Sequence, residues 1–208
     1  EIRLSLVGSE MCIRDSSDAM STPPVLVEMI YNEIRRGNQE KLNGLWNLSC
    51  SSAILDPQIL HYLVEHGIYI NQCYSMTELA GYGLLNVVQE GEHLRALGKP
   101  DGFCEVKLDE TGEICIKGDC VMLGYYKDPE ATAEVIDADG WFHTGDLARV
   151  DEDGYYYITG RKKNLIILDS GENVSPEELE KLLVPCADIR ECIVKEKDKK
   201  ICALIYCD

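Results

Sequence analysis

Five glycine-punctuated segments follow one another between residues 112 and 180. They are GEICIKG, GYYKDPEAT, GWFHTGDL, ITGRKKNLII and GENVSPEELE. Together with the turn sequences DETG (109–112) and DEDG (151–154), they separate stretches rich in the residue types found in strands. The Asp-Pro pair at 128–129 suits the N-cap and first turn of a helix. We therefore predict a small β subdomain over about residues 97–160, with one inserted helix.

The first part of the chain has the order of an α/β fold. Apolar residues recur at helical spacing from Pro23 to Arg36, and a second helix is predicted after Asp56. The segment IYINQCY (68–74) is short and β-branched, so we expect a buried strand that leads into a loop. In open α/β sheets, ligands bind at the carboxyl ends of the strands. We therefore expect a binding loop directly after this strand.

The basic sequence GRKK at 160–163 marks the last boundary in the chain. The following segment NLIILD predicts a strand, and SPEELEKLL predicts a helix that begins with a capping box at Ser175. The two final apolar segments predict a β-hairpin. We therefore predict an α/β fold in which residues 17–161 belong to one domain and residues 162–208 begin a small α+β domain.

Composition limits the function of the chain. The 208 residues carry a formal net charge of -17, which repels phosphate backbones, so neither nucleic acid nor an anionic membrane is expected as a partner. No apolar stretch approaches the roughly 20 residues of a transmembrane helix. The ten cysteines form no CxxC pair and have no histidine at metal-ligand spacing, which argues against a zinc site. Scattered cysteines are typical of the reducing cytoplasm, where we expect an acidic enzyme.

Residues 1–16 are treated separately, because they have no sustained apolar period and do not begin with Met. The sequence MCIRDS at 11–16 resembles the translation of a transposase adaptor used in sequencing libraries. We therefore interpret residues 1–16 as a non-native, adaptor-derived tail, the alternative being a genuine N-terminal tail.

The motifs from 112 to 180, together with NQCYSMTE at 71–78, resemble the AMP-forming acyl-adenylate superfamily over about residues 20–208. The branch they resemble most is that of the long-chain fatty acid CoA ligases, because Lys163 stands where peptide-synthetase adenylation domains commonly have Asp. The resemblance implies an ATP-dependent and Mg²⁺-requiring ligase. A carboxylic acid attacks ATP to give acyl-AMP and pyrophosphate, and the thiol of coenzyme A (CoA) then displaces AMP. Residues 17–161 would be the C-terminal portion of the large AMP-binding domain.

The segment NQCYSMTE resembles the family's aromatic-Gly-x-Thr-Glu loop at a strand end. The resemblance implies that Tyr74 stacks on adenine, Thr77 binds phosphate and Glu78 holds Mg²⁺. A flat ring, a hydroxyl donor and a hard carboxylate suit these three roles. Ser75 stands where the family has glycine and is assigned to the nucleotide site. Taken alone, Thr-Glu is typical of an ordinary helix start.

The resemblance also assigns a ribose-binding group. HTGD ends in Asp146, which in the family binds both ribose hydroxyls, and Arg161 matches the arginine that contacts ribose and phosphate oxygens. Arg161 lies fifteen positions after Asp146, enough for two strands and a turn, so both could project from one end of a hairpin. Ile158 is assigned to the same nucleotide site. Without this context, Gly-Asp is typical of a turn and Arg161 of a surface salt bridge.

The remaining assignments lie in three loops. CSSAIL (50–55) resembles the family's small-residue loop between the acyl pocket and adenine, which assigns Ser52 and Ala53. Lys163 aligns with the hinge about which the family's small domain rotates, and Gly171 belongs to the loop that lines the thiol channel. The structural alternatives are an ordinary polar loop for CSSAIL, a basic linker for Lys163 and a glycine turn for Gly171.

Two family signatures are not found in the 208 residues: the Ser/Thr/Gly-rich phosphate loop and the C-terminal catalytic lysine. In the family the first lies upstream and the second downstream of the matched region. We therefore interpret the chain as an internal fragment with negligible adenylation activity of its own. Two alternatives stay open for the intact protein: an adenylation domain that loads a carrier protein, and a nucleotide-binding pseudoenzyme. The identity of the acid and the oligomeric state are not predicted.

Overall fold

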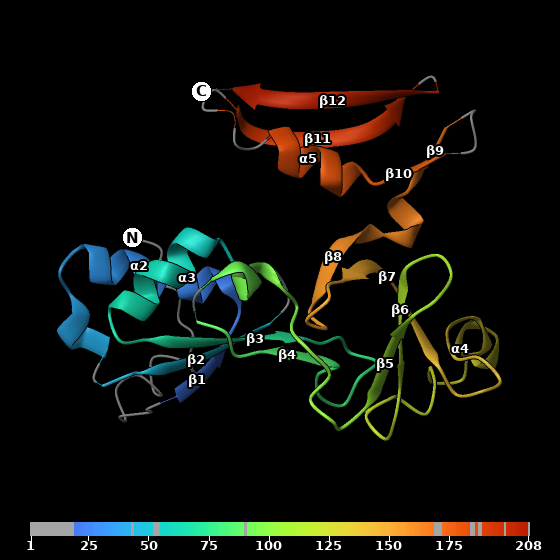
Figure 1. The fold of residues 1–208 in the computed structure, drawn as a ribbon, viewed down its shortest axis with the longest axis horizontal. Helices are drawn as coiled ribbons and strands as arrows, with labels where there is room; N and C mark the ends of the chain where they lie inside the picture. The colour runs from blue at the N-terminus through green and yellow to red at the C-terminus, as the bar shows by residue number, and fades with distance from the viewer. Residues whose placement is uncertain are drawn as a thin grey trace. The chain divides into compact units, whose positions relative to one another are not determined.

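The computed structural model describes most of the chain after residue 18 (Figure 1). The described residues are 19–42, 44–51, 55–89, 91–168, 172–183, 186, 189–197 and 199–207. The chain divides into two compact units. The first comprises Glu1–Cys104, Gly118–Met122 and Glu152–Tyr156, and the second comprises Glu105–Lys117, Leu123–Asp151 and Tyr157–Asp208.

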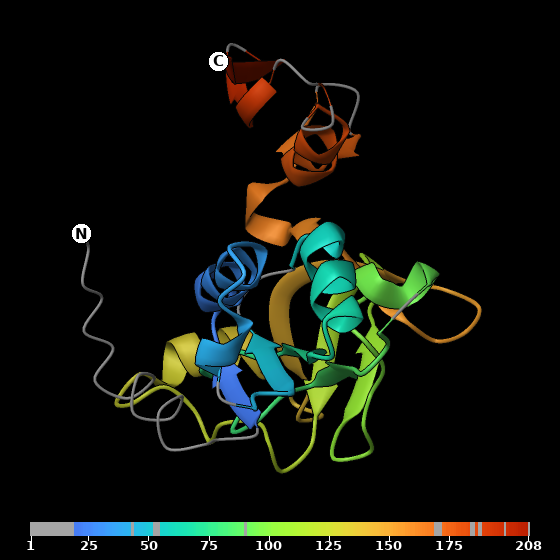
Figure 2. The ribbon, with the colours of Figure 1, turned by 90° about the vertical axis from the view of Figure 1, so that its left-hand side faces the viewer.

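The first unit contains a four-stranded sheet in the order β1-β2-β3-β4. Its strands are β1 (Ala19–Thr22), β2 (Asn47–Ser51), β3 (Tyr69–Tyr74) and β4 (Leu84–Asn86). The first three are parallel, and β4 runs antiparallel to β3. Helices α2 (Pro24–Arg35) and α3 (Pro57–Glu65) connect the parallel strands and lie on the same face of the sheet (Figures 1 and 2). The short 3-10 helices η1 (Gln39–Leu42) and η2 (Glu92–Arg95) complete the unit.

Apolar residues of the two helices and the strands form the core of this unit. Val27, Ile30 and Ile34 recur at helical spacing on one side of α2 and are buried. Helix α3 begins after Asp56, whose side chain accepts a hydrogen bond from the backbone N–H of Gln58 at 2.8 Å. Both predicted helices and the predicted strand at 68–74 are therefore confirmed, with β3 starting one residue later. The core also includes Leu48, Cys50, Leu60, Leu63, Ile68 and Ile70.

The second unit contains a four-stranded sheet in the order β5-β6-β7-β8. Its strands are β5 (Glu105–Leu108), β6 (Glu113–Lys117), β7 (Phe142–Val150) and β8 (Tyr156–Arg161). Strand β6 pairs antiparallel with both β5 and β7. Helix α4 (Pro129–Val135) is inserted between β6 and β7, and Asp128 caps it by accepting a hydrogen bond from the N–H of Ala131 at 2.9 Å. The predicted strands and inserted helix are confirmed.

Strand β6 is buried on both of its faces. Because side chains alternate along a strand, Ile114 and Ile116 share one face while Glu113 and Cys115 share the other. Glu113 is 3% exposed and Cys115 is 0% exposed. A carboxylate buried in this way is unfavourable unless polar partners satisfy it. The face of Glu113 and Cys115 therefore has to carry such partners, and the candidate site lies there.

The rest of the second unit follows β8. It contains the 3-10 helix η3 (Lys162–Asn164), β9 (Ile166–Ile167), β10 (Asn173–Val174), α5 (Pro176–Leu183), β11 (Ile189–Lys197) and β12 (Lys200–Cys207). The strand predicted for residues 164–169 is shorter than expected, because the turn of η3 takes its first residue and only Ile166–Ile167 pair with β10. Helix α5 begins as predicted, with Ser175 Oγ accepting from the N–H of Glu178 at 3.3 Å. The predicted hairpin is confirmed as β11 and β12.

Two expectations about the organisation of the chain are not tested by these elements. The predicted tail at 1–16 lies outside the described residues, and the domain boundary after residue 161 stays a prediction. None of the helices in the described ranges is long and apolar enough to cross a membrane.

Candidate functional site

Asp146 and Arg161, the predicted ribose-binding pair, lie together in the second unit. Nε of Arg161 is 2.8 Å from Oδ1 of Asp146. Asp146 belongs to β7 and Arg161 ends β8, the neighbouring strand, which confirms the proximity predicted from their spacing. The side chain of Asp146 is 4% exposed, whereas that of Arg161 is 54% exposed. The pair therefore combines a buried carboxylate with a guanidinium group that solvent reaches.

The backbone around Gly145 sets the direction of Asp146. Gly145 has a φ of 73°, a left-handed conformation that favours glycine. Its N–H donates to Oε1 of Glu113 at 2.8 Å, and the hydroxyl of Thr144 donates to the carbonyl of Ile114 at 2.9 Å. The same hydroxyl oxygen accepts from the N–H of Asp146 at 3.1 Å. These bonds hold the HTGD segment against β6 and so fix the position of the Asp146 carboxylate.

Glu113 is a buried carboxylate that holds several partners at once. Its Oε2 lies 2.7 Å from Nζ of Lys162 and 3.3 Å from Nδ1 of His143. The hydrogen bond to Glu113 raises the pKa of the Lys162 ammonium group, although partial burial acts in the opposite direction. Through this carboxylate, β6 is linked to the HTGD segment of β7 and to the first residue of η3.

A hollow of about 400 Å³ lies beside these residues in the second unit. Glu113, His143, Gly145 and Lys162 line it, together with Asp137, Thr144 and part of α4. An ammonium group, an imidazole and carboxylates therefore face the same space, which suits a polar ligand. Asp146 is not among the residues that line this hollow.

The predicted phosphate and Mg²⁺ loop lies in the first unit. Tyr74 ends β3 and is 8% exposed, and Ser75 after it is half-buried. Thr77 and Glu78 form a turn, so the ordinary helix start considered from the sequence is not what these residues adopt. Thr77 is exposed, and the carbonyl of Glu78 accepts a hydrogen bond from the N–H of Met122 at 2.8 Å. This backbone bond fixes the turn.

The other predicted site residues lie in the second unit or outside the described ranges. Lys163 is exposed in η3. Ile158 is half-buried in β8, and its carbonyl accepts from Nζ of Lys181 at 3.2 Å. The described site residues thus fall in both units: Tyr74, Ser75, Thr77 and Glu78 in the first, and Asp146, Ile158, Arg161 and Lys163 in the second. Of these, the structure brings Asp146 and Arg161 into contact. Ser52, Ala53 and Gly171 lie outside the described residues.

Sequence reasoning missed Glu113, His143 and Lys162. All three stand inside recognised motifs, but the motifs were interpreted through their neighbours Asp146, Arg161 and Lys163. Thirty positions separate Glu113 from His143, and 49 separate it from Lys162. One signal was available, since Glu113 is a charged residue at the start of a strand whose next three residues are all apolar.

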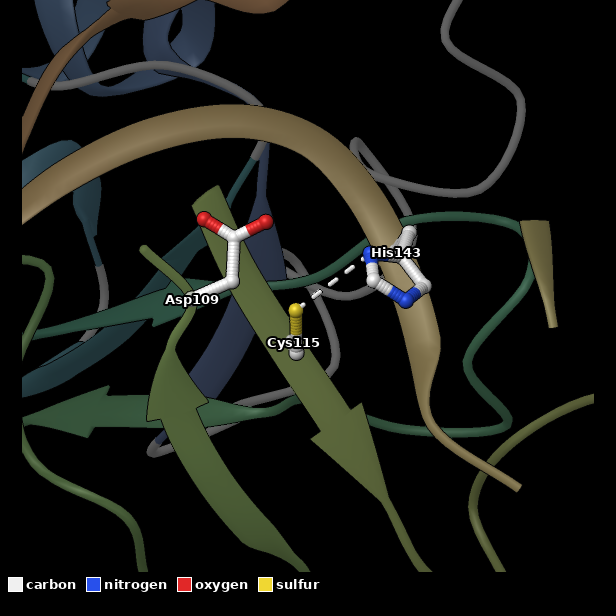
Figure 3. A group of neighbouring side chains, drawn as sticks. All are labelled: Asp109, Cys115 and His143. Atoms are coloured by element: carbon white, nitrogen blue, oxygen red, sulfur yellow. Dashed lines mark hydrogen bonds between the residues drawn. The ribbon is translucent and has the colours of Figure 1, made fainter. Parts of the chain in front are cut away.

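A second group on the same face joins Asp109, Cys115 and His143 (Figure 3). Each residue offers one possible metal-ligand atom, and the three atoms lie within 4.8 Å of one another. Sγ of Cys115 is 3.5 Å from Nδ1 of His143. Burial, together with the charges of Asp109 and Glu113, raises the pKa of the Cys115 thiol to about 11.

Comparison with known proteins assigns the chain to a family. A family model described as AMP-binding enzyme matches residues 10–126. The chain is 33% identical over 184 residues to "Long chain acyl-CoA synthetase 7, peroxisomal" of Arabidopsis thaliana, with 80% of this chain and 25% of that protein covered. It is 37% identical over 170 residues to a feruloyl-CoA synthase of an Amycolatopsis species, with 76% of this chain and 34% of that protein covered. The chain thus spans a quarter to a third of the length of these relatives.

A solved structure gives the same result for the fold. The o-succinylbenzoate coenzyme A synthetase of Bacillus subtilis, in complex with ATP and magnesium ion, matches with a TM-score of 0.78 and 25% identity. The match covers 96% of this chain and 43% of that chain. The fold is therefore that of part of an adenylate-forming domain. The chain belongs to the AMP-binding enzyme family, within which it is most like the long-chain acyl-CoA synthetases.

Proposed function

We propose that this chain is part of an AMP-forming acyl-CoA synthetase, which uses ATP to activate a fatty acid and then transfers the acyl group to CoA. One relative is named for long-chain acyl groups and the other for a feruloyl group, so a carboxylic acid is the substrate class that they share. The choice of a fatty acid rests on the similarity to the long-chain branch. The 208 residues alone are proposed to have negligible adenylation activity, as predicted from their sequence.

The Asp146–Arg161 pair is the observation that carries this proposal. An ionised carboxylate accepts hydrogen bonds only and has two oxygens, so Asp146 can receive both neighbouring hydroxyls of a ribose. The buried carboxylate is already held in one direction by the HTGD backbone. Arg161 presents a planar set of donors that suits phosphate oxygens. Because this side chain is 54% exposed, it can reorient toward a phosphate while water solvates it.

The residues of the first unit fit the phosphate and metal roles by chemical type. The exposed hydroxyl of Thr77 can donate to a phosphate oxygen, and a carboxylate such as Glu78 is the ligand type that Mg²⁺ prefers. Backbone bonds from Met122 to Glu78 and from Ala80 to Cys120 hold this turn in place. Tyr74 and Ser75 keep their proposed places beside the adenine.

Several finer parts of the proposal rest on the family resemblance. Lys163 is proposed as the hinge, which its exposed position in η3 allows. Ile158 is proposed to contact the nucleotide, while Ser52, Ala53 and Gly171 are proposed for the acyl, adenine and thiol loops. CoA is the proposed second substrate. A reducing cytoplasmic location remains a proposal based on the cysteine content.

A titration with AMP tests the role of Asp146. A hydrogen bond to a charged group contributes about 1.5–3 kcal/mol, so Asp146→Asn should weaken AMP binding by about 10- to 100-fold. The wild-type chain should bind 2′,3′-dideoxy-AMP more weakly than AMP by a similar factor, because that ligand lacks both ribose hydroxyls. Binding is followed by NMR shifts of the β7 and β8 amides during titration of the whole 208-residue chain.

The matched control is Asp139→Asn, which removes an exposed carboxylate in the turn before β7 and should leave AMP binding unchanged. In Asp146→Asn, AMP and the dideoxy ligand should bind almost equally. If the wild-type chain binds both ligands equally, or if Asp146→Asn still prefers AMP to the wild-type extent, Asp146 does not bind the ribose and the proposal fails.

A further inference from the structure

Three side chains from separate segments meet on the buried polar face of the second sheet (Figure 3). Cys115 of β6 and His143 of β7 are register partners in the antiparallel pair, so their side chains lie side by side. Asp109 comes from the turn between β5 and β6. No zinc site was predicted from the sequence, because the cysteines form no CxxC pair and have no histidine at metal-ligand spacing. The sheet register is what brings Cys115 and His143 together.

The sulfur–nitrogen distance within the cluster suits a small divalent ion. Zinc binds sulfur at about 2.3 Å and nitrogen or oxygen at about 2.0–2.2 Å, so two of its tetrahedral ligand atoms lie about 3.5 Å apart. Sγ of Cys115 and Nδ1 of His143 are 3.5 Å apart. Figure 3 shows the sulfur of Cys115 facing a ring nitrogen of His143, with the side chain of Asp109 beside them.

Two of the three side chains are also held in place by outer partners. The other ring nitrogen of His143, Nε2, lies 3.4 Å from Oδ2 of Asp137, which is the arrangement that orients most metal-binding histidines. Asp137 is itself fixed, because its Oδ1 accepts from the backbone N–H of Asp139 at 3.0 Å and of Trp141 at 2.9 Å. Oδ1 of Asp109 accepts from both N–H and hydroxyl of Thr111, at 2.8 and 2.7 Å, and from a further backbone amide.

The charges around His143 favour a cation. Carboxylate oxygens face both ring nitrogens, Glu113 at Nδ1 and Asp137 at Nε2, yet a neutral imidazole can donate from only one nitrogen. The ammonium group of Lys162 supplies one positive charge at Glu113. The hollow lined by Glu113, Asp137 and His143 reaches the imidazole, which is one of the three side chains of the cluster. A metal ion between Nδ1 of His143 and the sulfur of Cys115 would add positive charge beside these carboxylates.

We propose that Asp109, Cys115 and His143 bind one divalent transition-metal ion of the zinc type, with water as the remaining ligand. Binding forms a metal–sulfur bond and releases the thiol proton of Cys115 to solvent, with no change of oxidation state. The ion would join the β5–β6 turn to β6 and β7, the strand that carries Asp146. This inference does not depend on the proposed enzymatic function.

Titration with Co²⁺ tests the site, because cobalt replaces zinc and a thiolate–cobalt bond absorbs in the near ultraviolet. The probe is Co²⁺ added to the chelator-treated, untagged chain. We expect one ion per chain with that absorption band, and Zn²⁺ should displace it. Cys115→Ser should abolish the band. Asp137→Asn removes only the partner that orients His143 and should weaken Co²⁺ binding by about 10- to 100-fold.

The matched control is Cys104→Ser, which removes another buried thiol whose pKa is also raised to about 11. This variant should keep the band. The proposal is overturned if the wild-type chain gives no band, or if the band survives in Cys115→Ser. Should Cys115→Ser fail to fold, X-ray absorption of the cobalt-loaded wild type decides. One sulfur with nitrogen and oxygen neighbours supports the site, and any other ligand shell overturns it.

Discussion

Replacing Glu113 with alanine tests whether one buried carboxylate holds the HTGD segment in place. The N–H of Gly145 donates to Oε1 of Glu113 at 2.8 Å, and a hydrogen bond to a charged group contributes about 1.5–3 kcal/mol. The contact with half-exposed Lys162 adds at most about 1 kcal/mol, because water screens it. We expect Glu113→Ala to lower the free energy of opening at Gly145 by about 2–3 kcal/mol. Its amide should then exchange about 30- to 150-fold faster.

Amide hydrogen exchange at Gly145 is the measurement, made in buffer with a chelator so that metal plays no part. Glu113→Gln keeps a neutral acceptor, and the difference from a charged one is about 1 kcal/mol, so exchange should rise only about fivefold. The matched control, Glu110→Ala, removes an exposed carboxylate in the preceding turn and should leave Gly145 unchanged. Equal exchange rates in folded Glu113→Ala and Glu110→Ala would refute the reasoning. Equal rates in the Ala and Gln variants would show that charge, not the acceptor, holds the segment.

Two further predictions concern stability. Gly98 has a φ of 113°, and a Cβ there would collide with the backbone of Leu85. Gly98→Ala should therefore lower the free energy of unfolding, measured with denaturant, by about 2–4 kcal/mol. Gly154→Ala, at a φ of 83° with open space around it, should cost only about 1–2 kcal/mol, and equal costs would contradict the packing argument. Burial raises the pKa of Glu177, but hydrogen bonds from Asn164 and Ser175 leave it below the ordinary value of 4.5. The stabilisation that ionised Glu177 gives to α5 is therefore complete above pH 4.5. It is lost as pH falls through the lower pKa of Glu177 in the folded chain. Amide exchange in α5 should show that loss in the wild type but not in Glu177→Gln, and the same acid transition in both would rule Glu177 out.

Elements with local signals could be predicted from the sequence. Asp-Pro pairs mark the starts of α3 and α4, and in both cases the Asp side chain caps the helix. Ser175 marks the start of α5 in the same way. The strands of the second sheet follow from the turns that separate them. In each case the deciding interaction joins residues a few positions apart, so the chain carries the signal within a short window.

Contacts set by strand register could not be predicted in this way. The pairing of Cys115 with His143 depends on how β6 aligns with β7, and the register shifts between Glu113 and Cys115. A shift of one residue would place the opposite set of side chains on this face. Glu113 therefore had no visible partner in the sequence, although Lys162 and the Gly145 amide satisfy it in the fold. The family resemblance singled out Asp146 and Arg161, and their proximity was predictable because two neighbouring strands and one turn connect them.

If a ribose binds as proposed, the unequal exposure of Asp146 and Arg161 indicates which of the two side chains moves. The Asp146 carboxylate is 4% exposed and is held through Gly145 and Thr144, so displacing it would break hydrogen bonds to β6. The guanidinium of Arg161 is 54% exposed, so water can solvate it when it leaves Asp146. A buried carboxylate still needs a partner, and Arg161 supplies it until hydroxyl donors take its place. The same ion pair would thus stabilise β7 in the absence of a nucleotide and free a phosphate-binding group in its presence.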